Sequence, residues 1–338
     1  MTRALDRAAE NGWVLRQQIF VREKVPAKLF LKMIRALGMA PGLLHGLRSQ
    51  QLGEVHVVPG TTLERFGREA AVFVARRLRG CANVGVAWGG ELASVVTGLN
   101  GMRVLRPGSA GIDIFPLRGD PIGFLPARDR SLLERSPSAL AEMLHRVLNP
   151  RGNFVNSLSG VPAMVPPLGQ GDEEKFRVLE EILGEIPAYA RVVGKKQGGR
   201  GAWKRAKPLL ETADMILTSV GPAQAVSPWT QRCFASDPHL RRRKPEDMIA
   251  GDIAGVLLPN ARGSGAAFRA LQRRWLGVNR DHLKECVRRA EGKNSGGVVI
   301  CALNPAKADA ILQAIEAGLC SCLIVGSELA LAICRTMR

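Results

Sequence analysis

The fold class of this chain is indicated by the stretch Asn83-Val-Gly-Val-Ala-Trp-Gly-Gly-Glu-Leu92. Residues 83–87 form a short apolar run of the kind that becomes a buried strand. Trp88-Gly89-Gly90 interrupts the run, and the apolar spacing of residues 92–99 then favours a helix. Residues 63–79 also predict a helix, because their apolar side chains fall on one helical face. The order helix, strand, glycine turn and helix is typical of a doubly wound α/β protein.

The same alternation recurs along the chain. Ser136 is placed to cap a helix, and Pro137 suits its first helical position. We expect residues 160–165 to be extended. Further strands are expected over residues 54–58, 112–117, 214–220, 298–303 and 321–325, and further helices over residues 136–148, 173–185 and 306–317. The elements predict an α/β fold with a Rossmann-like, mostly parallel sheet, helices on both faces and a short N-terminal helical segment.

Length and composition narrow the class of protein. The chain has 338 residues, enough for a complete hydrophobic core, and we expect a main domain over residues 51–338 after a separate segment, residues 1–50. The seven cysteines include no CxxC pair, so no metal site is expected, and reduced cysteines suit a cytoplasmic protein. The apolar residues 319–334 are too few to span a membrane and contain Glu328. The glycine turn lacks GxGxxG spacing, which disfavours a nicotinamide cofactor; no cofactor is expected.

A strong positive charge points to anionic partners. The formal net charge is +18, and the pI is near 10.4. Residues 194–207 and 239–245 are basic, irregular stretches that we expect to be surface loops. They are either solvated loops or contacts to DNA phosphates. The candidate phosphate contacts are Lys195, Lys196, Arg200, Arg241, Arg242, Arg243 and Lys244.

Five segments, in order, resemble the sugar-binding domain of SorC-type transcriptional regulators. They cover roughly residues 50 to 335: Val84-Gly-Val-Ala-Trp-Gly-Gly-Glu-Leu92, Phe115-Pro-Leu-Arg-Gly119, Ala213-Asp-Met-Ile-Leu-Thr-Ser-Val-Gly221, Ala250-Gly-Asp-Ile-Ala-Gly255, and Ala306-Lys-Ala-Asp-Ala-Ile311 with Leu323-Ile-Val-Gly-Ser-Glu-Leu-Ala330. The resemblance implies a Rossmann-like fold related to sugar-phosphate isomerases and CoA transferases. It further implies a regulator rather than an enzyme, a phosphorylated sugar effector and a homo-oligomer, dimer or tetramer.

An effector of this kind is expected at the carboxyl ends of the strands. Its phosphate needs backbone N–H groups at a glycine turn that opens a helix, together with one or two cations. Arg232 is a weaker candidate cation. The candidate ligand residues are Gly89 and Gly90 in the turn, Glu91 beside it, Arg118 and Lys307 as cations, and Asp252 and Ser327 as partners of sugar hydroxyls.

Five of these candidates also have a purely structural explanation. Gly89-Gly90 suits a tight strand-to-helix turn in any α/β protein. Arg118 has a possible surface partner in Asp120, and Lys307 has a place on the surface at the start of a helix. Asp252 is equally suited to capping a turn.

Two positions depart from the family pattern. Glu91 stands where the family has threonine, and Ser327 stands where it has aspartate. A carboxylate beside a phosphate would repel it. Either Glu91 points away from the ligand, or the ligand has no phosphate at that position. Residues 2–21 resemble only the end of a helix-turn-helix, so residues 1–50 are interpreted as a remnant of a DNA-binding region with linker helices.

Two other functions remain open at the level of sequence. A sugar-phosphate isomerase would need a carboxylate base, and Glu91 is placed to supply one. A basic nucleic-acid-binding protein with a degenerate ligand pocket would account for the positive charge and the two basic stretches.

Overall fold

The computed structural model describes residues 54–58, 62–102, 111–120, 134–165, 172–194, 207–225, 231, 234–235, 241–260, 266–291, 293 and 295–336. The expectations for residues 1–50, for Arg232 and for Lys195, Lys196 and Arg200 lie outside this part of the chain. Within it, no helix is both long and apolar enough to cross a membrane.

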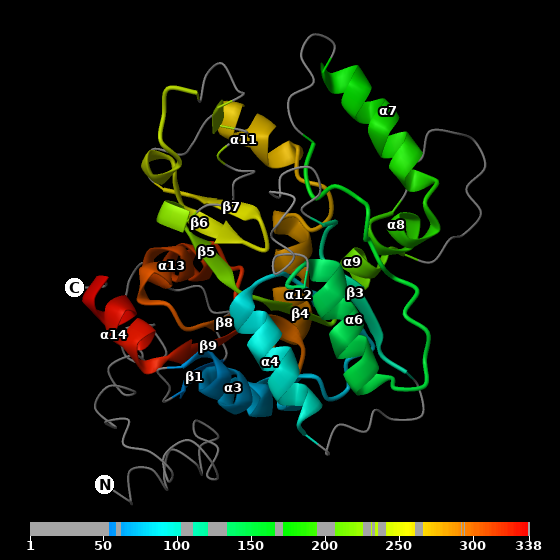
Figure 1. The fold of residues 1–338 in the computed structure, drawn as a ribbon. Helices are drawn as coiled ribbons and strands as arrows, with labels where there is room; N and C mark the ends of the chain where they lie inside the picture. The colour runs from blue at the N-terminus through cyan, green and yellow to red at the C-terminus, as the bar shows by residue number, and fades with distance from the viewer. Residues whose placement is uncertain are drawn as a thin grey trace, which may run out of the picture.

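A parallel sheet of six strands forms the centre of the molecule (Figure 1). Its order is β1-β9-β8-β4-β2-β3, and every neighbouring pair is parallel. The strands are almost wholly buried, as expected for a parallel sheet covered on both faces. They are β1 (Glu54–Val58), β2 (Asn83–Val86), β3 (Asp113–Pro116), β4 (Met215–Thr218), β8 (Gly297–Ala302) and β9 (Cys322–Gly326). The predicted Rossmann-like sheet is confirmed.

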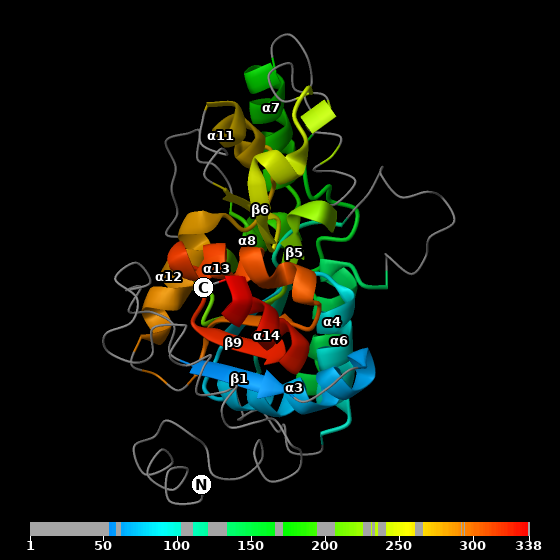
Figure 2. The same cartoon turned by 90° about the vertical axis from the view of Figure 1, so that its left-hand side faces the viewer.

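Helices cover both faces of this sheet (Figure 2). One face carries α3 (Leu63–Arg77), α4 (Gly90–Asn100) and α6 (Pro137–Leu148), and the other carries α12 (Arg280–Ala290). Ser136 caps α6 as predicted, because its hydroxyl accepts a hydrogen bond from the Ala139 N–H at 3.2 Å. The remaining helices are α7 (Asp172–Gly184), α8 (Pro187–Val192), α9 (Leu209–Thr212), α11 (Ala266–Arg273), α13 (Ala308–Glu316) and α14 (Ser327–Thr336).

A second, antiparallel sheet lies beyond the carboxyl ends of the large one (Figure 1). It consists of β5 (Val220–Pro222), β6 (Ile249–Ile253) and β7 (Val256–Pro259). A separate cluster of buried side chains, including Met164, Met248 and Trp275, packs around it. Helix α13 contacts all three of its strands and thereby joins the two sheets.

Three expected elements differ from the structure. The strand expected over residues 214–220 is two strands in different sheets, because β4 ends at Thr218 and β5 begins at Val220. Residues 160–165 form only isolated bridges, at Pro162 and Met164. The helix expected over residues 306–317 begins with a 3₁₀ turn, η3 (Pro305–Lys307), and becomes α-helical at Ala308; two further 3₁₀ turns are η1 (Ala223–Ala225) and η2 (Pro245–Asp247).

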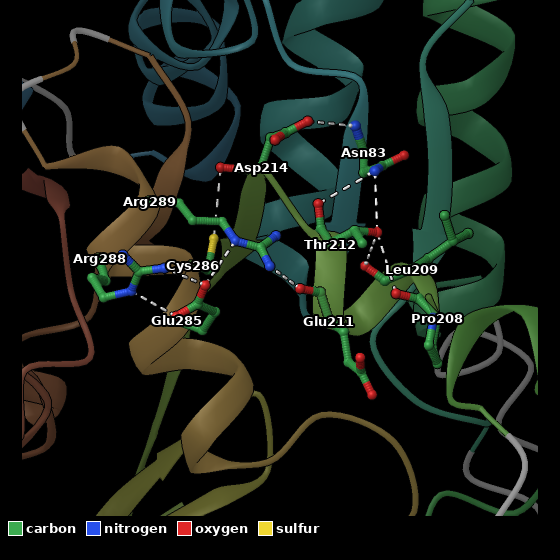
Figure 3. A network of polar contacts seen from close by, with 10 residues as sticks. All are labelled: Asn83, Pro208, Leu209, Glu211, Thr212, Asp214, Glu285, Cys286, Arg288 and Arg289. Atoms are coloured by element: carbon green, nitrogen blue, oxygen red, sulfur yellow. Dashed lines mark hydrogen bonds and ion pairs between the residues drawn. The ribbon is translucent and has the colours of Figure 1, made fainter. Parts of the chain in front are cut away.

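A polar network closes the amino edge of the large sheet (Figure 3). The Asp214 carboxylate accepts hydrogen bonds from the N–H groups of Ala82 and Asn83 at 2.8 and 3.0 Å. The Asp214 carbonyl accepts from the Gly297 N–H at 2.7 Å and from the Cys286 thiol at 3.6 Å. The network continues through Pro208, Leu209, Glu211, Thr212, Glu285, Arg288 and Arg289. The protein's own contacts thus occupy this edge.

Helices α3 and α4 approach each other with almost no side chain between them. A Cβ atom added to Gly98 would lie 2.6 Å from the Gly67 carbonyl oxygen, and one added to Gly67 would lie 2.4 Å from the Ser94 carbonyl oxygen. The Ser94 hydroxyl also donates a hydrogen bond to the Leu63 carbonyl at 2.6 Å. The two helices therefore form one tightly packed pair.

We expect Gly98→Ala to lower the free energy of unfolding by about 1–3 kcal/mol, because overpacking forces the two backbones apart. Gly101→Ala is the matched control. Gly101 has an ordinary φ of −73°, and its added Cβ would meet only the Gly98 carbonyl oxygen, at 3.5 Å. Urea unfolding of both variants tests this, and equal stabilities would show that the helices separate without cost.

Candidate functional site

The candidate residues gather at the carboxyl edge of the large sheet. Glu91 follows β2, Ser219 follows β4, and Lys307 lies in the segment that follows β8. The chain turns outward to β3 after β2 but towards β8 after β4, so neighbouring strands β2 and β4 flank a topological switch point. Ligands of open α/β sheets bind at such points.

Glu91 lies at the centre of a set of hydrogen-bond donors. Its Oε1 accepts from the backbone N–H groups of Leu303 at 2.9 Å and Asn304 at 3.4 Å. Its Oε2 accepts from the Ser219 hydroxyl at 2.9 Å and forms an ion pair with the Lys307 ammonium group. Lys307 also donates to the Ser219 hydroxyl at 3.0 Å. We call the donors of Ser219, Leu303, Asn304 and Lys307 the anion cradle.

This geometry decides two alternatives that the sequence leaves open. The first is the direction of Glu91, which points into the candidate site, so a phosphate could take that position only if Glu91 moved out of it. The second is the place of Lys307, whose side chain is 12 % exposed and belongs to the cradle rather than to the surface. Backbone N–H groups, a hydroxyl and an ammonium group are together the donors that bind carboxylates and phosphates.

Arg118 is wholly buried next to the second sheet. The centre of its guanidinium group lies 5.3 Å from the Trp88 ring and 4.6 Å from the Trp275 ring. A Cβ at Gly255 would lie 2.2 Å from Arg118 Nη1, so only glycine fits there. Its three nitrogen atoms have no hydrogen-bond partner within the described part of the chain. The possible surface pair with Asp120 is therefore wrong, because Arg118 is 1 % exposed and lies against the Trp88 and Trp275 rings.

Asp252 is a buried carboxylic acid whose ionisation is favoured by the charges of both Arg118 and Lys307. Burial raises the pKa of its carboxyl, although a hydrogen bond from the Gly255 N–H and the charges of Arg118 and Lys307 act in the opposite direction. That hydrogen bond is 2.7 Å long and caps the β6–β7 turn, as the structural explanation expected. Gly221 makes room for the carboxylate, because a Cβ there would lie 2.4 Å from Asp252 Oδ2.

The remaining candidate residues considered next, Gly89, Ser327 and residues 241–244, are not among the donors of the anion cradle. Gly89 has a φ of +126°, which explains the glycine, and it begins α4 without a side-chain cap. Ser327 is the first residue of α14, directly after β9, and no side-chain contact links it to the cradle within the described residues. The described members of the basic loops, Arg241, Arg242, Arg243 and Lys244, are all exposed.

Sequence reasoning missed part of the site. It did not select Ser219, Leu303 and Asn304 as donors, or Trp88 and Trp275 as neighbours of Arg118. Ser219 lay inside a predicted strand, and backbone N–H groups carry no residue-specific signal. Trp88 was visible within the glycine turn, but nothing in the sequence linked it to Trp275.

Among the residues that the structure describes, one group of side chains has donor atoms close enough to hold a metal ion. Glu54, His56 and Cys322 place their donor atoms within 4.8 Å of one another on β1 and β9. Glu54, however, already contacts His56 Nε2 at 2.7 Å and Arg77 at 3.3 Å. These contacts account for Glu54 and His56 without a metal ion.

Comparison with known proteins gives similarity at the level of fold. No family model and no curated protein matches the sequence. Among solved structures, the full-length sorbitol operon regulator SorC from Klebsiella pneumoniae aligns with 98 % of this chain and 88 % of its own, at 16 % identity and a TM-score of 0.62. A transcriptional regulator from Streptococcus pneumoniae aligns with 91 % of this chain and 98 % of its own, at 14 % identity and a TM-score of 0.59.

A domain of a possible sugar-binding transcriptional regulator from Arthrobacter aurescens aligns with 86 % of this chain and 95 % of its own. Its identity is 18 % and its TM-score is 0.53. At these identities the likeness establishes the fold. The SorC-type fold that the five sequence segments imply is confirmed.

We expect Asp252→Asn to change how stability depends on pH. Because the folded state raises the pKa of Asp252 above the ordinary 3.8, wild-type stability falls as the pH rises through 3.8 towards the folded pKa. The asparagine variant still accepts the Gly255 hydrogen bond but lacks this titration. The free energy of unfolding of the variant should therefore gain on that of the wild type as the pH rises above 3.8, as denaturant unfolding at several pH values would measure. A constant difference would show that Asp252 ionises without penalty.

Proposed function

We propose that this chain is the effector-sensing part of a transcriptional regulator and that it binds a phosphorylated sugar or a related small anionic metabolite. The observation that carries the proposal is the anion cradle at the switch point between β2 and β4. Its donors are suited to a phosphate group. The solved regulators with this fold, some of them described as sugar-binding, support the regulatory role.

The site residues then have distinct roles. The phosphate accepts hydrogen bonds from Lys307, Ser219 and the N–H groups of Leu303 and Asn304, after Glu91 has left the cradle. Asp252 accepts hydrogen bonds from sugar hydroxyls. Arg118, buried against the two indole rings, lowers the electrostatic cost of the Asp252 carboxylate, since its positive charge favours the ionised form.

The geometry does not favour the isomerase alternative. An isomerase base needs a carboxylate oxygen free to take a proton from the substrate. In the resting state both oxygens of Glu91 accept hydrogen bonds and one is paired with Lys307, and when an anion enters the cradle Glu91 leaves it. Measured turnover of a sugar phosphate that is abolished in Glu91→Gln would instead support an enzyme.

The regulator is proposed to be cytoplasmic, to form a homo-oligomer (dimer or tetramer) and to contact DNA. DNA contact is supported by the net charge and by the exposure of Arg241, Arg242, Arg243 and Lys244. Residues 1–50 are proposed to belong to a DNA-binding region, and residues 51–338 to form the effector domain.

We expect a phosphorylated sugar to raise the thermal stability of the wild-type protein. At about one hundred times the dissociation constant, binding stabilises by about 2.7 kcal/mol, which a thermal-shift screen resolves. Lys307→Ala should abolish the response, whereas Lys284→Ala, which removes an exposed lysine on α12, should not. If no phosphorylated sugar stabilises the wild type while an unphosphorylated one does, the effector does not bind through a phosphate.

Replacing Arg241, Arg242, Arg243 and Lys244 together by glutamine should weaken DNA binding on any sequence. The slope of log K against log salt should become shallower by about 0.9 for each phosphate that the variant no longer neutralises. Fluorescence anisotropy at several salt concentrations measures both quantities. Unchanged affinity and slope would show that this loop does not touch DNA.

A further inference from the structure

We propose that Glu91 is an internal competitor of the effector: its carboxylate occupies the anion cradle in the resting state, and a ligand anion must displace it. We call these contacts of Glu91 with Ser219, Leu303, Asn304 and Lys307 the Glu91 latch. The proposal deepens the proposed function, on which it rests for the identity of the effector. The latch itself is tested separately, by whether removal of the Glu91 carboxylate allows the cradle to bind an external anion more tightly.

The contacts of Glu91 are those of a bound ligand. Both of its oxygens are used, each by two donors, and the donors come from the segments that follow β4 and β8. The Glu91 and Lys307 side chains are each only 12 % exposed, so the pair is largely shielded from water. A second anion in the same place would meet a carboxylate whose charge already balances that of the lysine. The two anions therefore exclude each other by space and by charge.

The start of α4 is built so that Glu91 is able to leave. Glu91 is the second residue of α4 and follows Gly89 and Gly90. The Gly89 cap has a positive φ and makes no side-chain capping hydrogen bond. A Cβ at Gly89 would meet no atom within 4 Å among the described residues. Neither glycine of this turn has a side chain to contact its surroundings, so Glu91 supplies the side-chain contacts that tie the first residues of α4 to the cradle.

The latch also connects distant parts of the fold. It ties the first turn of α4 to the β4–β5 connection and to the segment between β8 and α13. Helix α4 is tightly packed on α3. Helix α3 follows β1, which is the outermost strand on the far side of the sheet from β2 and β3. Release of Glu91 therefore frees the start of the α3–α4 pair from the cradle. This provides a physical route from ligand binding to a change in the rest of the protein.

The energetic consequence is a raised threshold for the effector. Apparent affinity falls in proportion to the fraction of molecules whose cradle is open. If about one molecule in a hundred is open, the apparent dissociation constant is about one hundred times the intrinsic one. Removing the latch should therefore tighten anion binding without adding any new interaction with the anion.

Inorganic phosphate is the probe that tests the latch directly. Isothermal titration calorimetry, at constant ionic strength set with chloride, compares the wild type with Glu91→Ala, Glu91→Gln and Glu91→Thr. We expect the dissociation constant for phosphate to fall at least tenfold in Glu91→Ala and Glu91→Thr. Glu91→Ala/Lys307→Ala, which removes the cation of the cradle, should not show that gain.

Glu64→Ala is the matched control for charge. Glu64 lies in the first turn of α3, is largely exposed and pairs only with Arg68 among the described residues, so its removal changes the net charge equally but leaves the cradle intact. It should bind phosphate as the wild type does. The latch is wrong if the wild type and the Glu91 variants bind phosphate with equal affinity, or if none of them binds it. Should Glu91→Ala fold poorly, Glu91→Thr and Glu91→Gln give the same comparison.

Different measurements would contradict the latch and the proposed phosphorylated-sugar effector. If the wild type binds a phosphorylated sugar as tightly as Glu91→Ala does, the sensing function stands and the latch is wrong. If Glu91→Ala gains affinity for inorganic phosphate but no sugar phosphate binds either protein, the latch stands and the sugar phosphate is not the effector.

Discussion

The parallel alignment of the six central strands is the constraint on which the rest of the structure depends. Because every strand points the same way, residues far apart in sequence reach one edge as the strands end. Glu91, Ser219 and Lys307 span more than two hundred positions along the chain and still form a single set of contacts. At the amino ends of the strands, the Asp214 network uses the polar groups for contacts within the fold. At the carboxyl ends, the hydrogen-bond donors of the anion cradle are gathered instead.

Burial of charge is what sets this site apart from the surface. A buried charge is costly unless an opposite charge or hydrogen bonds compensate for it. Glu91 and Lys307 compensate each other. Asp252 has one short hydrogen bond and the distant charges of Arg118 and Lys307, and Arg118 has two aromatic faces. The charges of Asp252 and Arg118 are therefore less fully compensated than those of the Glu91–Lys307 pair.

The sequence predicted the architecture well and the site only in part. Apolar runs ending in glycine turns located the central strands, and Ser136-Pro137 located the start of α6 correctly. Periodicity could not show that Ser219 separates two sheets, because residues 215–220 contain no glycine or proline and the break depends on pairing with β6. The direction of Glu91 was equally hidden, since its partners are backbone groups, a hydroxyl and a lysine brought near only by folding. The resemblance selected Lys307 and Arg118 as cations; Arg118 is buried and Lys307 is 12 % exposed, but the resemblance did not indicate which residues contact either of them.

The single residue between β4 and β5 has a structural consequence. Ser219 is the whole of the covalent link from the large sheet to the small one at this point, and its hydroxyl is part of the cradle. The carboxylate that fills the cradle is therefore hydrogen-bonded to the residue at which the chain passes from one sheet to the other, so the site and the junction of the two sheets share a side chain.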